Sequence, residues 1–563
     1  MLSESAHAGR VRRTRIAPGV VACVVVASLF AIADLRSAGP RFYSDDPLWA
    51  DNDRVVDVKD AHEVDLDNYY DFLENSVGTP GDRSKKRAVN VNTLDEVPNS
   101  SWFENRIGQR EMSIAELTKG PNRDVHFGTA WTIVRGKNRG FHPGFRAVDR
   151  SDPTHAVYQI EVDPPRHPEM ASGAEVVGAA FYHAFGYHTE EVYLTEIDPA
   201  ALEIAPTATI RDANGRRPFV GNDLKEILKN AARLPNGRIR VTAERFLDGE
   251  DMGRFEYHGT RSDDPNDIYP HEHRRELRGS RVFAAWLNHD DSRAVNTMVL
   301  RHREGGKAYL KYYIVDFGSI LGSATRFEDP PQAGREYILA GRPSLLTLAT
   351  FGLYVRPWIR FPDPPVPAAV GRFTAERFDP RTWVAEYPKA AYENMREDDA
   401  FWAARIVARF SDAAVRALVE KGRYSDPATV DHLVATLIKR RDRIKEVWLT
   451  GINPIVNPTL SAEGQFRFDN AAVMHGVGGL PEGYVLRWSR FDNTTDTHTP
   501  VGPEILIEDS LARAPAGVLT GSDYIAVSIA TRHPDFPAWK PVQVYFRRAG
   551  DAWQTVGLDR HLD

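Results

Sequence analysis

The sequence predicts an α+β protein with a strand-rich lobe, a helical lobe and a small all-β module, in that order. Short apolar segments of strand character flank one helical segment between residues 128 and 247. Amphipathic helices follow one another from 398 to 448, and short alternating segments return after 453. Because 563 residues exceed what one hydrophobic core usually holds, we expect separate domains.

Composition excludes some classes of function. The chain is 42% hydrophobic and 26% charged, with a mean hydropathy of -0.42, which is ordinary for a globular protein. A formal net charge of -7 gives no electrostatic reason to expect a nucleic-acid partner. The single cysteine, Cys23, lies in an apolar run near the N-terminus, so we expect no thiol enzyme.

Residues 1–39 have the pattern of an export signal or a membrane anchor. Four arginines, the last of them Arg15, precede the uncharged apolar run 16–33. Positive charge before the run places the N-terminus in the cytoplasm and the bulk of the chain outside it. We expect a periplasmic or inner-membrane-anchored protein that contacts the membrane only through this segment. Cleaved signal and anchor both stay open, and lipidation at Cys23 is a lesser alternative.

The next segment, 40–127, is polar, acid-rich and punctuated by aromatic residues. It predicts an extended N-terminal segment that wraps the core without forming a domain. The strand-rich lobe follows at 128–247. Its expected elements are strands at 130–134, 145–148 and 156–162, a helix at 169–185, and strands at 192–197 and 240–247. A loop with three glycines, 135–144, joins the first two strands.

The helical lobe is expected at 248–452, beginning with a turn at 248–251 and a helix at 274–287. Its later elements are a proline-rich stretch at 357–367 and helices at 398–409, 411–421 and 428–448. The module at 453–563 has strand-like segments at 484–488, 504–507, 524–529 and 542–547, the spacing of a β-sandwich.

Two motifs carry the chemistry. His289 lies two residues before Asp291, and Asn296 lies five residues after it. The apolar run 312–315 then delivers Asp316-Phe317-Gly318 at the end of an expected strand. Their joint occurrence in this order is much less frequent by chance than either alone.

From about 128 to 450 the chain resembles the protein-kinase-like superfamily, and in particular its atypical, exported or small-molecule branches such as the HipA-type and CotH-type kinases. The amino-acid sequence of 263–276 is similar to that of an uncharacterised bacterial family of secreted kinase-like proteins. The resemblance implies a bilobal protein-kinase-like fold. The strand spacing after 453 independently predicts that the module behind it is an Ig-like or fibronectin-like sandwich. The resemblance also implies ATP with Mg²⁺ or Mn²⁺ as the cofactor and leaves the acceptor or protein partner unknown.

The resemblance implies a role for each residue of the cleft. The catalytic residues would be Asp291, as base or hydroxyl-orienting group, and His289. The metal ligands would be Asn296 and Asp316. The cofactor-binding residues would be Gly136, Lys137, Gly140, Glu161 and Glu175, with Glu175 on the helix of the strand-rich lobe.

One position departs from the kinase pattern. Glu161 occupies the place on the third strand where kinases have the lysine that binds the phosphates. Carboxylates facing a triphosphate in a low-dielectric cleft would repel it by several kcal/mol. Lys137, Arg139 or Arg146 could replace the missing cation, or Glu161 could hold an extra metal ion. A shift of one residue in the strand register would instead turn Glu161 to solvent.

Competing motifs fail on their spacing. His271-Glu272-His273 is followed by Arg275 where a zincin needs its second histidine, and the chain has no G-x-S-x-G. Two hypotheses follow. The first is an exported kinase-like protein that binds nucleotide and divalent metal and transfers phosphate to a protein or small molecule. The second is a catalytically inactive pseudokinase that serves as an envelope ligand-binding or scaffold protein.

Overall fold

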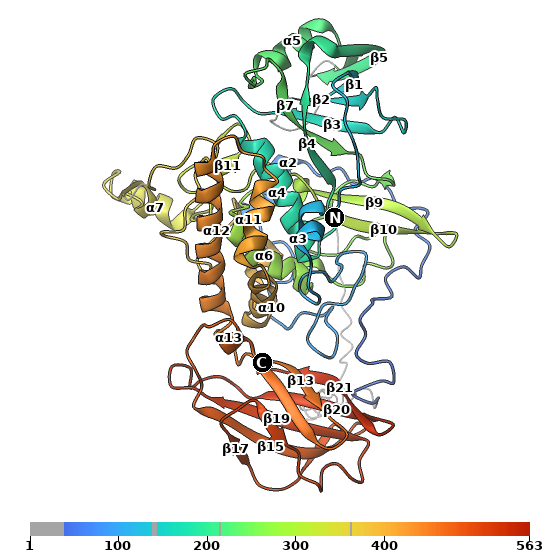
Figure 1. Ribbon diagram of the computed structural model, residues 1–563, viewed down its shortest axis with the longest axis vertical. Coiled ribbons are helices and arrows are strands. Elements are labelled where there is room, and N and C mark those ends of the chain that lie inside the picture. Colours follow the sequence, from blue (N-terminus) through green and yellow to red (C-terminus); the bar gives the residue numbers. More distant parts are fainter. Residues whose placement is uncertain (1–38, 138–143, 213–214, 361–362, 563) are drawn as a thin grey trace, which may run out of the picture.

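The computed structural model describes residues 39–137, 144–212, 215–360 and 363–562. It is a mixed α+β protein with a large β-sheet at one end, a helical region in the middle and two packed sheets at the other end (Figure 1). Among the described residues no helix is both long and apolar enough to cross a bilayer. The apolar run 16–33 and Gly140 lie outside those residues.

The large sheet has seven strands, and all neighbours are antiparallel except the parallel pair of β1 and β5. Its spatial order is β4 (Glu191–Ile197), β7 (Ile239–Arg245), β3 (Val157–Val162), β2 (Gly144–Asp149), β1 (Trp131–Gly136), β5 (Leu202–Asp212) and β6 (Gly215–Pro218). Along β3 buried residues alternate with half-buried ones. Because a strand places successive side chains on opposite faces, Gln159 and Glu161 share the face away from the sheet's own core.

Helix α4 (Met170–Phe185) lies between this sheet and the helical region, and every residue of it except His183 is buried. Asp163, just after β3, holds the start of this helix, because its carboxylate accepts hydrogen bonds from the backbone N–H groups of Glu169 and Ser172 at 3.0 and 2.9 Å. The small residues of α4 permit close packing. A Cβ on Gly178, for example, would lie 2.5 Å from the Cβ of Phe317. This contact joins α4 to the loop that carries Asp316.

An insertion separates β4 from β7 and was not expected from the sequence. It comprises a 3-10 turn at Pro199–Ala201, the hairpin of β5 and β6, and α5 (Gly221–Lys229). The hairpin extends the sheet beyond β1, on the edge away from β4. Pro206 and the scattered half-buried residues of β5 gave no clean alternation from which to predict a strand.

The helical region has one hydrophobic core, which it shares with α4 and parts of the N-terminal segment. Its helices are α6 (Arg275–Leu287), α7 (Gly341–Ala349), α8 (Pro357–Arg360), α9 (Ala390–Glu393), α10 (Glu397–Ala408), α11 (Asp412–Glu420) and α12 (Pro427–Trp448), with 3-10 turns at His271–His273 and Ala294–Asn296. Its strands are β8 (Glu250–Asp251), β9 (Thr297–Glu304), β10 (Lys307–Ile314), β11 (Ser323–Ala324) and β12 (Phe327–Glu328).

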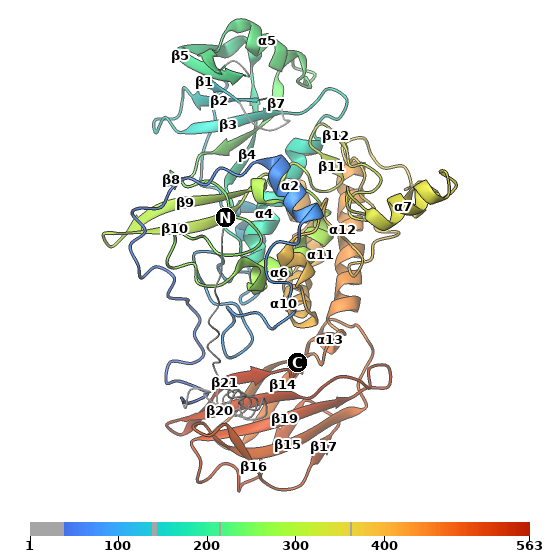
Figure 2. The ribbon, with the colours of Figure 1, turned by 180° about the vertical axis from the view of Figure 1, so that it is seen from behind.

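Residues 39–127 contact all three regions, and Figure 2 shows this segment passing from the C-terminal sheets toward the large sheet. It holds α2 (Asn68–Val77) and α3 (Ile114–Lys119) and is otherwise mostly irregular. Val64 forms a β-bridge with Gly253, and Phe42 packs among buried aromatic residues of the C-terminal sheets.

The C-terminal region packs two antiparallel sheets around one core. One sheet contains β13 (Ile455–Leu460), β14 (Gln465–Asn470) and β18 (Leu511–Arg513). The other contains β15 (Gly483–Asp492), β16 (Thr497–Pro500), β17 (Ile505–Ile507), β19 (Tyr524–Arg532), β20 (Val542–Ala549) and β21 (Ala552–Asp559), and a short helix, α13 (Ala471–Met474), follows β14.

Candidate active site

A cleft separates the large sheet from the helical region. Two adjoining cavities of about 690 and 610 Å³ fill it. Five residues line both cavities: Asp65, Lys137, Glu161, Arg254 and Asp316. The larger cavity extends under β1 and β2, and the smaller one extends to Asp291 and Asn296. Residues far apart in sequence therefore share one polar site.

The loop that follows α6 carries Asp291 and Asn296. The side-chain Nδ2 of Asn296 donates to the backbone oxygen of Asp291 at 2.8 Å, which leaves the amide oxygen as the free acceptor of that side chain. Arg293 forms an ion pair with the Asp291 carboxylate. Burial raises the pKa of Asp291 to about 7, although Arg293 opposes the shift. A carboxylate with such a pKa is suited to accept a proton near neutral pH.

A buried lysine donates hydrogen bonds to the same loop. Lys389 donates from Nζ to the Ser292 hydroxyl at 2.7 Å and also reaches the Ser292 backbone oxygen. Its Nζ lies 3.7 Å from the ring centroid of Tyr392, and burial lowers its pKa well below the ordinary value. Lys389 thus fixes the backbone next to Asp291.

Asp316 follows β10 with a left-handed backbone, at φ 64°. Such a conformation is unfavourable for a residue with a Cβ and is found mainly where function or packing imposes it. The backbone N–H of Asp316 donates to Glu190 Oε1 at 3.2 Å, and the N–H of Phe317 donates to Glu175 Oε1 at 3.0 Å. Two glutamates therefore fix the turn that presents Asp316 to the cleft.

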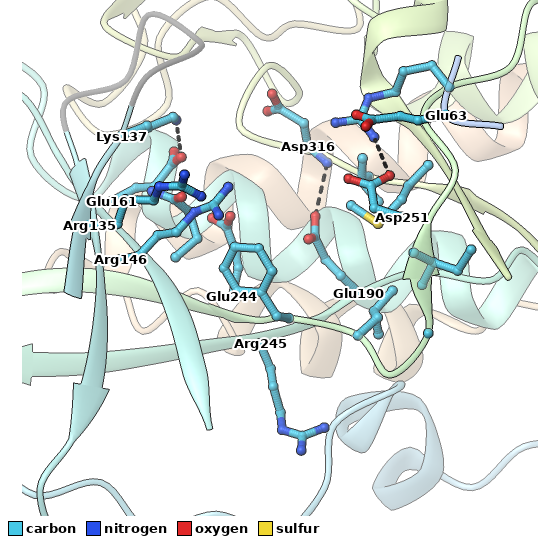
Figure 3. Close-up of a pocket in the computed structure, with 18 of the residues that line it drawn as sticks. Glu63, Arg135, Lys137, Arg146, Glu161, Glu190, Glu244, Arg245, Asp251 and Asp316 are labelled. Carbon is cyan, nitrogen blue, oxygen red and sulfur yellow. Dashed lines mark hydrogen bonds and ion pairs between the residues drawn. The ribbon is translucent and has the colours of Figure 1, made fainter. Parts of the chain in front are cut away.

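Lys137 places a cation beside Glu161 in the cleft. It lies just beyond β1, and its Nζ forms an ion pair with Glu161 of β3, as Figure 3 shows. Burial disfavours the charged form of Lys137, but the nearby carboxylates Glu161, Glu244 and Asp316 outweigh it and raise its pKa. Glu161 is therefore not turned to solvent, so the register-shift alternative was wrong.

The cleft contains more carboxylates than the sequence motifs indicated. Burial raises the pKa of Glu190 to about 7, and it raises the pKa of Glu175 and Glu244 well above the ordinary value, with the neighbouring carboxylates adding to the effect. Sequence reasoning missed Glu190 and Glu244. A useful signal was available, because Glu244 follows the apolar part of a strand that pairs with the strand of Glu161.

Arginines line the same cleft as these acids. Arg135 of β1 and Arg146 of β2 line the larger cavity, and the guanidinium of Arg146 lies 4.5 Å from the ring centroid of Phe246, just after β7. Within the described residues the buried Nε of Arg146 has no hydrogen-bond partner. Leaving a buried donor without a partner costs free energy of folding, so this N–H group favours an anionic or carbonyl-bearing ligand in the cleft.

The remaining sequence-predicted residues have different surroundings. Gly136 ends β1, where a Cβ would lie 2.8 Å from Ile210, so packing explains it. His289 is fully buried and lines neither cavity. Its Nδ1 lies 2.8 Å from the Tyr182 hydroxyl, and burial lowers its pKa to about 3. Its assignment as a catalytic residue is therefore corrected to a positioning residue. Gly140 lies outside the described residues.

Four of the site residues predicted from the sequence lie together in the structure. Glu161, Asp291, Asn296 and Asp316 line the cleft, and a Cβ on Gly318 would lie 3.2 Å from a carboxylate oxygen of Glu175 and 3.8 Å from one of Asp316. Sequence reasoning missed the contribution of the N-terminal segment, since residues 65–69 form one wall of the smaller cavity.

Among the described residues, one cluster of three carboxylate or imidazole side chains has its possible metal-ligand atoms all within 4.8 Å of one another. It consists of Glu74, Glu256 and His258, which line neither cavity. The cleft carboxylates thus do not form a protein-only metal cage.

Comparison with known proteins gives no further assignment. No family model matches the chain, and no curated protein or solved structure matches it either.

Proposed function

We propose that this protein is a kinase-like phosphotransferase that binds a nucleoside triphosphate and a divalent cation in the cleft. The observation that carries the proposal is the meeting of Asp291, Asn296 and Asp316 in one cleft beneath a β-sheet. The order β4-β7-β3-β2-β1, with α4 behind it and the hairpin of β9 and β10 leading to Asp316, supports a bilobal protein-kinase-like fold.

The cleft residues fit a metal–nucleotide ligand. Buried acids with raised pKa values repel one another, and a divalent cation held by Asp316 and the amide oxygen of Asn296 would relieve that repulsion. When bound, the cation neutralises phosphate charge in the transferring group. Lys137, Arg135 and Arg146 provide positive charge on the sheet side of the same cleft, where phosphate oxygens need donors.

Asp291 is the residue that would orient the acceptor hydroxyl and accept its proton. The hydroxyl oxygen attacks the terminal phosphorus of the nucleoside triphosphate. The bond from that phosphorus to the bridging oxygen breaks, and the nucleoside diphosphate leaves with the electron pair. Arg293 holds the Asp291 carboxylate in place, and Lys389 fixes the adjoining backbone. The smaller cavity, walled by residues 65–69, is the space available to the acceptor.

A second function, that of a pseudokinase, is favoured by the Lys137–Glu161 ion pair. Glu161 partly neutralises Lys137, the one lysine among the described residues that lines both cavities, so less positive charge faces the phosphates. In this alternative the protein binds a nucleotide or another ligand without turnover and serves as an envelope scaffold. The two-sheet C-terminal region, which we propose to be Ig-like, would then supply a partner surface.

The location that we propose is outside the cytoplasm. It rests on the arginines and the apolar run 16–33 of the sequence. The phosphate donor must then be available in the envelope.

Nucleotide binding is tested by thermal unfolding of the full chain with ATP and Mg²⁺ or Mn²⁺. Ligand at a hundred-fold excess over Kd should stabilise the protein by about 3 kcal/mol. Asp316→Asn keeps a residue that tolerates positive φ but removes the charge, so it should abolish most of the stabilisation. Asp496→Asn, at φ 54° in the C-terminal region, is the matched control and should retain it.

Absence of stabilisation in the unaltered protein, or equal stabilisation of the Asp316→Asn variant, would contradict nucleotide binding at this cleft. Stabilisation without transfer of labelled phosphate to protein, lipid or sugar acceptors would favour the pseudokinase. Transfer that is lost in Asp291→Asn would favour the phosphotransferase.

A further inference from the structure

Residues 338–360, which we call the apolar spur, project from the side of the helical region. In both ribbon views α7 extends away from the body of the molecule (Figures 1 and 2). No residue of α7 or α8 is buried. The exposed fractions reach 97% for Phe351, 85% for Leu353 and 74% for Leu348. Soluble surfaces seldom gather large apolar side chains in this way unless they bind something.

The base of the spur is anchored to the body, whereas its tip is not. Trp358 donates from Nε1 to Glu336 Oε2 at 2.8 Å, and Arg356 forms an ion pair with the same glutamate. The N–H of Ile338 donates to the backbone oxygen of Glu386 at 2.8 Å. The exposed tip, residues 345–355, turns at Gly352 with φ 84°. A fixed base and a projecting apolar tip distinguish the spur from an unpacked loop.

Its charge indicates what the tip meets. Residues 337–362 contain three arginines and no acidic residue; counting Glu336, which pairs with Arg356, the segment carries a formal charge of +2, whereas the whole chain carries -7. Tyr354 and Trp358 are half-buried toward the base. Apolar side chains at the tip, with aromatic and arginine side chains behind them, are the order in which a protein segment meets the hydrocarbon, interface and headgroups of a bilayer.

We propose that the apolar spur inserts its tip into the surface layer of a lipid bilayer that carries anionic headgroups. A protein partner would need a complementary groove, and a narrow spur offers little flat surface for a second copy to bury. Anionic headgroups, in contrast, match the arginines without a shaped surface. If the apolar run 16–33 is retained as a membrane anchor, the spur would set how the cleft faces the membrane. This inference does not depend on the proposed phosphotransfer.

The test places one fluorophore on the spur of the full chain. Because Cys23 is the only cysteine, a chain with Cys23→Ser and Leu353→Cys accepts a single environment-sensitive label such as NBD. Vesicles of phosphatidylglycerol and phosphatidylcholine should shift its emission to shorter wavelength, and phosphatidylcholine alone should shift it less. The matched control carries Cys23→Ser and Leu480→Cys in the C-terminal region, where Leu480 is 75% exposed, and should not shift.

Adding Phe351→Asp to the labelled chain should remove the shift. That side chain is almost fully exposed, so thermal unfolding should not change. An unchanged emission at position 353, or an equal shift at position 480, would overturn the proposal. A blue shift that grows with protein concentration without vesicles would overturn it in favour of a second copy.

Discussion

At the scale of single residues, burial and neighbouring charge determine how the cleft ionises. Asp291 loses solvation in the cleft, which raises its pKa, while Arg293 lowers it; the balance leaves the pKa at about 7. Glu161 forms an ion pair with Lys137, although both side chains are largely removed from water. The chemistry of each acid therefore depends on its partner more than on its residue type.

The phosphotransfer proposal predicts a rate that rises with pH around 7, as Asp291 loses its proton. Arg293→Gln removes the charge that favours the carboxylate, so the rising limb should move to higher pH and the rate at pH 7 should fall. The measurement is the pH profile of kcat/KM for phosphate transfer or ATP hydrolysis.

Arg301→Gln serves as the control, because Arg301 of β9 pairs with the exposed Glu250 of β8. This change should leave the rising limb of the pH profile where it is. A limb that stays in place in Arg293→Gln would show that Asp291 is not the titrating base.

At the scale of elements, α4 links the large sheet to the turn of Asp316. The helix can approach that turn because Gly178 has no side chain, and Phe317 occupies the space that a Cβ would fill. Glu175, one turn before Gly178, accepts the hydrogen bond from Phe317. The sequence predicted this helix within one residue of its observed start, since its apolar residues recur at helical spacing.

Gly178→Val should therefore be destabilising although valine is a better helix former than glycine. The new methyl groups would push Phe317 and Ile320 away, and overpacking of this kind costs about 1–3 kcal/mol. Chemical denaturation of the variant measures the change in the free energy of unfolding.

The control for this change is Gly221→Ala at the start of α5, where no atom lies within 4 Å of a new Cβ. It should have little effect or stabilise slightly. Equal stability of Gly178→Val and the unaltered protein would mean that α4 and the Asp316 turn move apart freely.

At the scale of the whole molecule, buried ion pairs join segments that are distant in sequence. Arg275 of α6 contacts Asp95 of the N-terminal segment at 2.9 Å, Asp398 at 2.9 Å and Asp399 at 3.1 Å. Arg560, just after β21, lies 3.5 Å from Asp95. One carboxylate thus connects the N-terminal segment, the helical region and the end of the chain.

Arg275→Met should cost about 3–5 kcal/mol of stability, because it leaves buried carboxylates without their cation. Arg443→Met breaks only the exposed pair with Glu446 and should change stability by less than about 0.5 kcal/mol. Denaturant unfolding compares the two, and equal losses would contradict the structural role of the buried network.

The pH dependence of the same network has a definite direction. Burial raises the pKa of Asp95, but Arg275, Arg87 and Arg560 outweigh it and lower the pKa to about 2. Asp95 therefore contributes stability that is fully present above the ordinary pKa range of an aspartate and is lost as the pH falls toward 2. In Arg275→Met this acid-dependent loss should be smaller.

The sequence by itself determined the α+β class and the order of most elements, because local periodicity determines where helices and strands form. That Asp291, Asn296 and Asp316 share one cleft was expected from the resemblance of their motifs to those of kinase-like proteins, and the fold brings the three residues together. Only the tertiary structure decided that Lys137 pairs with Glu161, that Glu190 and Glu244 enter the cleft, that residues 65–69 wall it, and that the spur projects. Those contacts join segments distant along the chain, and their geometry depends on strand order, on register and on the path of irregular segments, which have no periodicity to read.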